Sequence, residues 1–178
     1  MFQGSFTALI TPFKNGQIDD DAFVRLVARQ IELGTNGLVV CGTTGESATM
    51  TTEEREHVIA LCVKTANRKI PVIAGTGTND TAKTVEATRR AKELGADAAL
   101  VVTPYYNKPS QEGLYRHFKA VHDSVDLPII LYNVPGRTGV CLSVETIGRL
   151  AKLPHIAGIK DATPDLLRPI QIRRAVPD

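Results

Sequence analysis

The feature that most constrains the fold of this chain is a repeated pairing of a short apolar segment with a longer segment of helical spacing. The apolar segments recur at intervals of about 30 residues, the period of strand–helix units, and lie at residues 6–10, 38–41, 71–74, 98–102, 128–131 and 156–159. Helices are expected after them at residues 20–33, 51–66, 80–94, 110–124, 143–151 and from 165 onward. The strands are continuously apolar, which indicates burial on both faces and a parallel sheet.

Two α/β architectures fit six such units, a (β/α)₈ barrel and an open doubly wound sheet. A closed eight-unit barrel needs about 250 residues, whereas this chain has 178. We therefore expect residues 1–178 to form one domain without an internal linker. Either the chain is part of a longer protein, or it makes something other than a closed barrel by itself.

Composition excludes several function classes. The net charge is +2, the basic residues are scattered, and aromatic residues make up 5% of the chain, so nothing indicates a nucleic-acid surface. No apolar run reaches the ~18 residues of a membrane span, and the N-terminus does not resemble a signal peptide. The widely spaced cysteines, Cys41, Cys62 and Cys141, favour a reduced cytoplasmic protein in which all three are small core residues.

Polar residues gather directly after the predicted strands. Residues 42–46 place Thr43 and Thr44 between two glycines, a pattern that can bind a small anion such as a carboxylate or can simply be a tight loop. Residues 103–107 follow the fourth strand, and residues 132–139 follow the fifth. In a parallel barrel the carboxyl ends of all strands meet at one mouth, where such enzymes place their sites.

Lys160 follows the sixth apolar segment without an intervening turn residue. A lysine at the tip of a buried strand loses solvation, which favours a neutral amine able to attack a carbonyl carbon. We hypothesise a Schiff base between Lys160 and a keto acid; the alternative is an ammonium group in water. A tyrosine linked to a threonine hydroxyl could move protons. Arg137 offers a fork for a carboxylate, or is a surface arginine.

Two further motifs carry less weight. Gly75-Thr76-Gly77 lacks the third glycine of a dinucleotide-binding loop. The four histidines show no metal-ligand spacing. We predict neither a metal nor a nucleotide cofactor.

Four stretches in order, residues 42–47, 103–109, 132–138 and 158–163, resemble the dihydrodipicolinate synthase family. These are pyruvate-dependent class I aldolases with a (β/α)₈ barrel. The resemblance implies that Lys160 binds pyruvate as a Schiff base. It also implies that Tyr132, Thr43 and Tyr106 form a proton relay, with Tyr106 reaching in from a neighbouring subunit of a dimer or tetramer.

The same resemblance implies the substrates. Thr44 would hold the carboxylate of pyruvate, and Arg137 would receive the carboxylate of L-aspartate 4-semialdehyde. The product would be 4-hydroxy-tetrahydrodipicolinate, in lysine and diaminopimelate biosynthesis. Alternatives are another aldolase of the family acting on a sugar-derived or sialic acid, and a non-catalytic keto-acid-binding protein.

Two departures from the family pattern generate expectations. Thr52, Arg55 and Lys83 stand where lysine-inhibited members carry histidines and a glutamate, and a cation there should repel the lysine ammonium. We therefore expect weak or absent lysine feedback. The family also continues through two more strands, so we expect the 178-residue piece alone to have little activity.

Overall fold

The computed structural model describes residues 2–176, which divide into two compact units. Unit 1 runs to residue 76 and includes residues 90–100; unit 2 comprises residues 77–89 and the chain from residue 101 on. Unit 1 contains β1 (Phe6–Ala8), β2 (Phe13–Lys14), β3 (Gln17–Ile18), α1 (Asp20–Glu32), β4 (Gly37–Val40), η1 (Ser47–Thr49), α2 (Thr52–Ala66) and β5 (Val72–Gly75). Unit 2 contains α4 (Gln111–Ser124), β7 (Ile129–Asn133), α5 (Pro135–Thr138), α6 (Val144–Leu150), β8 (Ile156–Asp161) and α7 (Arg168–Ala175).

Two elements, α3 (Thr81–Glu93) and β6 (Ala98–Val102), carry residues of both units. The main sheet has the strand order β1-β4-β5-β6-β7-β8. The registers of β1 with β4, β4 with β5, β5 with β6, and β7 with β8 are all parallel. The predicted α/β class with parallel strands is confirmed. A separate antiparallel hairpin of β2 and β3 was not predicted; it forms around the Asn15-Gly16 turn.

Helix ends follow the local sequence closely. Thr51 and Glu54 form the predicted capping box at the start of α2, and Ser110 and Ser143 cap α4 and α6 as predicted. Asp19, not Asp20, caps α1 by accepting a hydrogen bond from the Ala22 amide at 2.9 Å. Each cap satisfies amide groups that the first helical turn leaves without partners.

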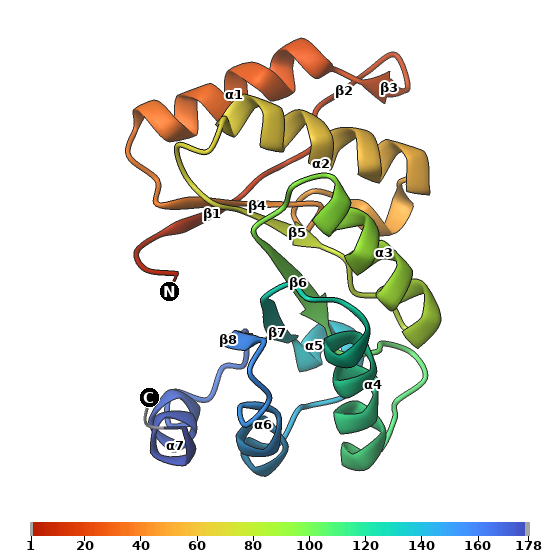
Figure 1. Ribbon diagram of the computed structural model, residues 1–178, viewed down its shortest axis with the longest axis vertical. Helices are drawn as coiled ribbons and strands as arrows, with labels where there is room; N and C mark the ends of the chain where they lie inside the picture. Colours follow the sequence, from red (N-terminus) through yellow and green to blue (C-terminus); the bar gives the residue numbers. More distant parts are fainter. Residues whose placement is uncertain (1, 177–178) are drawn as a thin grey trace. The chain divides into compact units, whose positions relative to one another are not determined.

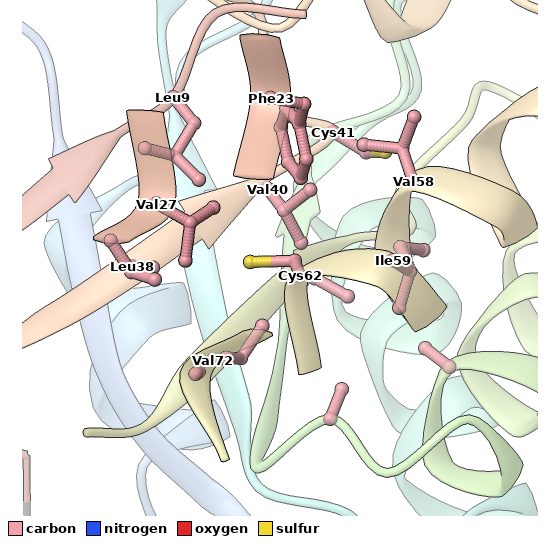
Figure 2. Close-up of a cluster of buried hydrophobic side chains, with 14 of the residues drawn as sticks. Leu9, Phe23, Val27, Leu38, Val40, Cys41, Val58, Ile59, Cys62 and Val72 are labelled. Atoms are coloured by element: carbon pink, nitrogen blue, oxygen red, sulfur yellow. The ribbon is translucent and has the colours of Figure 1, made fainter. Parts of the chain in front are cut away.

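The core of unit 1 lies between α1, α2 and the strands. Figure 1 shows α1 and α2 side by side, and Figure 2 shows the buried side chains that they share with the strands. Phe23 and Val27 of α1 meet Val58 and Cys62 of α2, all four fully buried. Gly75 closes this packing, because a Cβ there would lie 2.0 Å from the Cys41 carbonyl oxygen.

Unit 2 builds its own packing from α4, α6 and α7. Helix α6 packs against both α4 and α7. Leu114 and Phe118 of α4, Leu131 of β7 and Leu150 of α6 are buried. His117 is also buried, with Nδ1 2.9 Å from the Thr81 hydroxyl. Burial lowers the pKa of His117 from 6.5 to about 4, so its ring is neutral near pH 7.

Several predictions for the last third of the chain are wrong. Strand β8 was expected to be buried on both faces, but it forms one edge of the sheet and its residues are half-buried or exposed. Helix α7 begins at Arg168, not near residue 165, and Pro169 sits in its first turn, where a missing amide costs nothing. Cys41 and Cys62 are buried as expected, but Cys141 is exposed. No helix within residues 2–176 is long and apolar enough to cross a membrane.

Candidate active site

The two threonines of the predicted anion loop lie in a turn directly after β4. Thr43 and Thr44 are both exposed. The Gly45 and Glu46 amides donate to the carbonyls of Gly42 and Thr43 at 3.1 and 3.2 Å, so these two amides are used within the turn. Within the described part of unit 1, the hydroxyls and amides of Thr43 and Thr44 make no hydrogen bonds. Two hydroxyls and two amides, four donors in all, are therefore available to an anion, while two further amides of the loop are not.

Backbone conformation and one hydrogen bond fix the shape of this turn. Cys41 and Glu46 have positive φ angles of 54° and 58°, and the Thr11 hydroxyl donates to the Gly45 carbonyl at 2.8 Å. Burial raises the pKa of the Cys41 thiol to about 12, with Arg55 opposing this effect. Cys41 is thus an inert packing residue at pH 7, as the sequence suggested.

Lys160 and Tyr132 lie side by side in unit 2. They are register partners in the parallel pair β7–β8, so both side chains leave the same face of the sheet. The Lys160 Nζ atom lies 4.6 Å from the centroid of the Tyr132 ring, within cation–π range. Tyr132 is 7% exposed and therefore fixed by its surroundings.

The Lys160 side chain is exposed among the described residues. Strand β8 is the last strand in the order of the sheet that these residues form. The predicted desolvation of the amine stays a prediction. What the structure does provide is an amine held against a buried phenol ring, which orients the amine without burying it.

Arg137 lies in the single helical turn α5, which Pro135 begins and Gly139 ends with a φ of 72°. The Thr138 hydroxyl donates to the Val140 carbonyl at 2.9 Å, which fixes the chain after the turn. The Arg137 side chain is exposed and makes no hydrogen bond within the described part of unit 2. Its guanidinium is available to a carboxylate.

Tyr106 lies in the loop between β6 and α4 and is 88% exposed. Its φ of 69° is unusual for a bulky residue. The loop is nevertheless anchored within unit 2, since Asn107 and Asn79 exchange two hydrogen bonds of 2.8 and 3.1 Å. Tyr106 is therefore a large side chain presented to solvent on a fixed loop.

The structure thus brings Lys160 and Tyr132 together in unit 2 and places Thr43 and Thr44 on one turn of unit 1. Tyr106 and Arg137 stand on separate loops of unit 2. The sequence reading missed a polar network behind Lys160, made by Asn133, Asp161 and Arg168. In the sequence, the one indication of this network was the acidic residue Asp161 directly after Lys160.

A sheet of parallel βα units with polar side chains at the carboxyl ends of its strands is the arrangement of α/β-barrel proteins. The chain belongs to the dihydrodipicolinate synthetase family, whose model matches residues 1–178.

Individual relatives agree with this membership. The chain is 62% identical over 97% of its length to 4-hydroxy-tetrahydrodipicolinate synthase of Rhodospirillum centenum, of which it covers 60%. It is 61% identical over 94% of its length to the enzyme of the same name from Phenylobacterium zucineum, of which it covers 57%. The chain thus spans about 60% of the length of the curated relatives it matches.

A solved structure shows the same fold. The crystal structure of the chloride-inhibited dihydrodipicolinate synthase of Acinetobacter baumannii, complexed with pyruvate, matches 99% of this chain with a TM-score of 0.98 and 54% identity. The chain covers 61% of that protein. Of the two architectures left open by the sequence, the barrel type is confirmed and the doubly wound sheet is wrong.

Proposed function

We propose that this chain carries the reacting residues of a 4-hydroxy-tetrahydrodipicolinate synthase, which condenses pyruvate with L-aspartate 4-semialdehyde. The observation that carries the proposal is the register pair Lys160–Tyr132, with the amine 4.6 Å from the phenol ring centroid. A relative bearing this name is 62% identical, and one solved relative is complexed with pyruvate.

In this proposal the Lys160 amine attacks the keto carbon of pyruvate. The carbinolamine loses water to give an imine, and removal of a methyl proton gives an enamine. The enamine carbon attacks the aldehyde carbon of the semialdehyde, and the new amine-bearing chain cyclises and releases Lys160. Each step forms or breaks a bond at an atom within reach of one amine, which is how a covalent intermediate divides a difficult reaction.

Proton transfer falls to hydroxyl groups. The Tyr132 phenol stands beside the amine and suits the proton movements that form and collapse the carbinolamine. Thr43 and Tyr106 complete the proposed relay, and Tyr106 would act in the site of a neighbouring subunit of a dimer or tetramer. Its exposure of 88% on an anchored loop supports a role outside its own subunit's interior.

Carboxylate recognition falls to two separate groups. Thr44 would hold the pyruvate carboxylate through its amide and hydroxyl, which have no other partner within the described part of unit 1. Arg137 would take the carboxylate of the semialdehyde with its unpaired guanidinium. Neither role needs a cofactor or a metal.

An assay with the whole protein that carries this sequence tests the proposal. Product formation from pyruvate should require L-aspartate 4-semialdehyde and should fall by about 10²-fold in Tyr132→Phe, which keeps the ring but removes the phenol proton. The control Tyr115→Phe should keep wild-type turnover, because Tyr115 stacks against Arg149 at 4.1 Å on α4, away from the strands. Wild-type turnover in Tyr132→Phe would contradict the relay.

A second candidate function is an aldolase of the same family that uses a sugar-derived aldehyde. It differs only in the second substrate, so offering both aldehydes to the pyruvate adduct separates the two. Faster consumption of the sugar-derived aldehyde would replace our proposal with this one. A non-catalytic keto-acid-binding protein would form the adduct and turn over neither aldehyde.

We also propose that lysine feedback is weak. Arg55 donates to the Gly75 carbonyl at 3.3 Å, and its Nε atom is buried with no hydrogen-bond partner among residues 2–176. A fixed cation at this position opposes the binding of a second cation. Inhibition by submillimolar lysine would contradict this expectation.

A further inference from the structure

A half-buried ion pair begins at the residue that follows Lys160, Asp161, and joins it to Arg168. The Asp161 Oδ2 atom accepts hydrogen bonds from Arg168 Nε at 3.0 Å and from Arg168 Nη2 at 2.9 Å. Both side chains are 11% exposed. In the other described ion pairs of unit 2 that join a Lys or Arg to a carboxylate, both side chains are far more exposed. A pair shielded from water in this way holds its geometry much better than a surface pair does.

The pair extends into a network that reaches β7 and the chain after α5. The Asn133 amide group donates to Asp161 Oδ2 at 3.4 Å and accepts from the Leu142 amide at 2.9 Å. Arg168 Nη2 also donates to the Leu142 carbonyl at 2.9 Å. The Ala162 amide donates to the Asn133 carbonyl at 2.8 Å, which ties the end of β8 to the end of β7.

The register of the two strands shows what this network touches. Tyr132 pairs with Lys160, and the next residues along, Asn133 and Asp161, pair with each other. Successive residues of a strand point to opposite faces. The side chains of Asn133 and Asp161 therefore lie on the opposite face of the sheet from those of Tyr132 and Lys160, one residue further along each strand.

The charge state of Asp161 supports its ion pair with Arg168. Burial raises the pKa of Asp161, but hydrogen bonds from Thr163 and Arg168 outweigh that effect, so its pKa lies below the ordinary value. The carboxylate is therefore ionised at neutral pH and keeps its pair with Arg168. Removing either partner leaves the other charge uncompensated in a poorly hydrated place.

We propose that Asp161 and Arg168 are positioning residues that fix the distance between the Lys160 amine and the Tyr132 phenol. The inference rests on the proposed function and deepens it, since it assigns a task to residues that touch no substrate. Asn133 and Asp161 directly follow Tyr132 and Lys160 in the paired strands, so the hydrogen bonds that join them to each other and to Arg168 constrain the ends of both strands.

The test uses Asp161→Asn, Arg168→Met and Arg168→Lys in the whole protein that carries this sequence. Borohydride trapping with pyruvate is followed over time, at a temperature well below the melting point of each variant. Asp161→Asn and Arg168→Met should slow trapping at saturating pyruvate by about 10- to 100-fold. The half-saturating pyruvate concentration should change by less than about threefold, because binding groups are untouched. Arg168→Lys should recover part of the rate, since an ammonium can still pair with Asp161.

The matched control is Glu112→Gln, which weakens two exposed ion pairs, to Arg116 and Arg149. It should trap pyruvate at the wild-type rate. A lowered melting temperature with unchanged trapping in Asp161→Asn and Arg168→Lys would show a purely structural pair and overturn the inference. No adduct with the unmodified protein would overturn the proposed function as well. If Arg168→Met does not fold, the other two variants decide.

Discussion

Units 1 and 2 are built from similar strands and helices but differ in how far their strands are buried and in which polar groups the strands carry. In unit 1, strands β4 and β5 are buried along their whole length under α1 and α2. In unit 2, strand β8 is half-buried or exposed and carries a lysine and an acidic residue at its end. The first unit is held by apolar packing and offers two threonines on a turn. The second unit places the Lys160 amine of the candidate site over a phenol ring, with a charged pair formed by the next residue along the strand.

The contrast indicates where stability and chemistry reside. Apolar burial is non-directional and tolerates small displacements, whereas an amine and a phenol must meet at defined distances. We therefore expect substitutions in the core of unit 1 to lower the free energy of unfolding, and substitutions around Lys160 to lower rates. The following predictions separate the two kinds of effect.

The largest effect is expected at Lys160. Lys160→Met should reduce turnover by more than about 10³-fold, because it removes the amine proposed to form the imine. The melting temperature should change little, since the side chain is exposed. Lys152→Met, at another exposed lysine of unit 2, is the control and should keep full turnover. Equal turnover in both variants would contradict the proposal that Lys160 forms the imine.

In unit 1, Phe23→Ala should destabilise folding by about 3–5 kcal/mol, the cost of an aromatic cavity. Phe23 is fully buried in the cluster of Figure 2. Phe13→Ala is the control, because Phe13 is 43% exposed; it should cost less than about 1 kcal/mol. Urea denaturation measures both, and similar losses in the two variants would contradict the assigned core.

His117 makes unit 2 sensitive to acid. Its pKa is near 4 when folded and 6.5 when unfolded, so the unfolded state binds the extra proton as the pH falls below 6.5. The contribution to stability is complete above pH 6.5 and is lost towards pH 4, by up to about 3 kcal/mol. His117→Phe should flatten this part of the stability–pH curve, whereas His57→Gln at an exposed site should not. An unchanged slope in His117→Phe would refute the assignment.

The smallest effect is expected at the capping box of α2. Thr51→Ala should cost about 1 kcal/mol, because it removes the acceptor for the Glu54 amide. Thr52→Ala, one residue further on and equally exposed, should stay within about 0.5 kcal/mol of wild type. Equal losses would mean that the cap contributes nothing to unit 1.

What could be predicted from the sequence was mostly local. The caps at Thr51, Ser110 and Ser143 were correct because a cap depends on residues within one turn. Lys160 and Tyr132 were both placed at the ends of predicted strands, and the structure makes them register partners of β7 and β8. The roles of these residues, and of Thr43, Thr44, Tyr106 and Arg137, stay predictions.

What failed was non-local. The half-buried and exposed residues of β8 were not predicted, because an apolar run of four residues does not show how a strand is packed. The contact of Asn133 with Asp161 joins residues 28 positions apart, and only the parallel register brings them together. Asp19 replaced Asp20 as the cap of α1 because either acidic residue could start the helix, and spacing alone did not choose between them.

The most direct test of the account is the mass of the protein after borohydride reduction with pyruvate, followed by peptide mapping. We predict one stable adduct per chain, equal to pyruvate joined to an amine with loss of water and gain of hydrogen, located on the peptide that contains Lys160. An adduct on a different lysine, or none at saturating pyruvate, would contradict the claim that this amine is the reacting group.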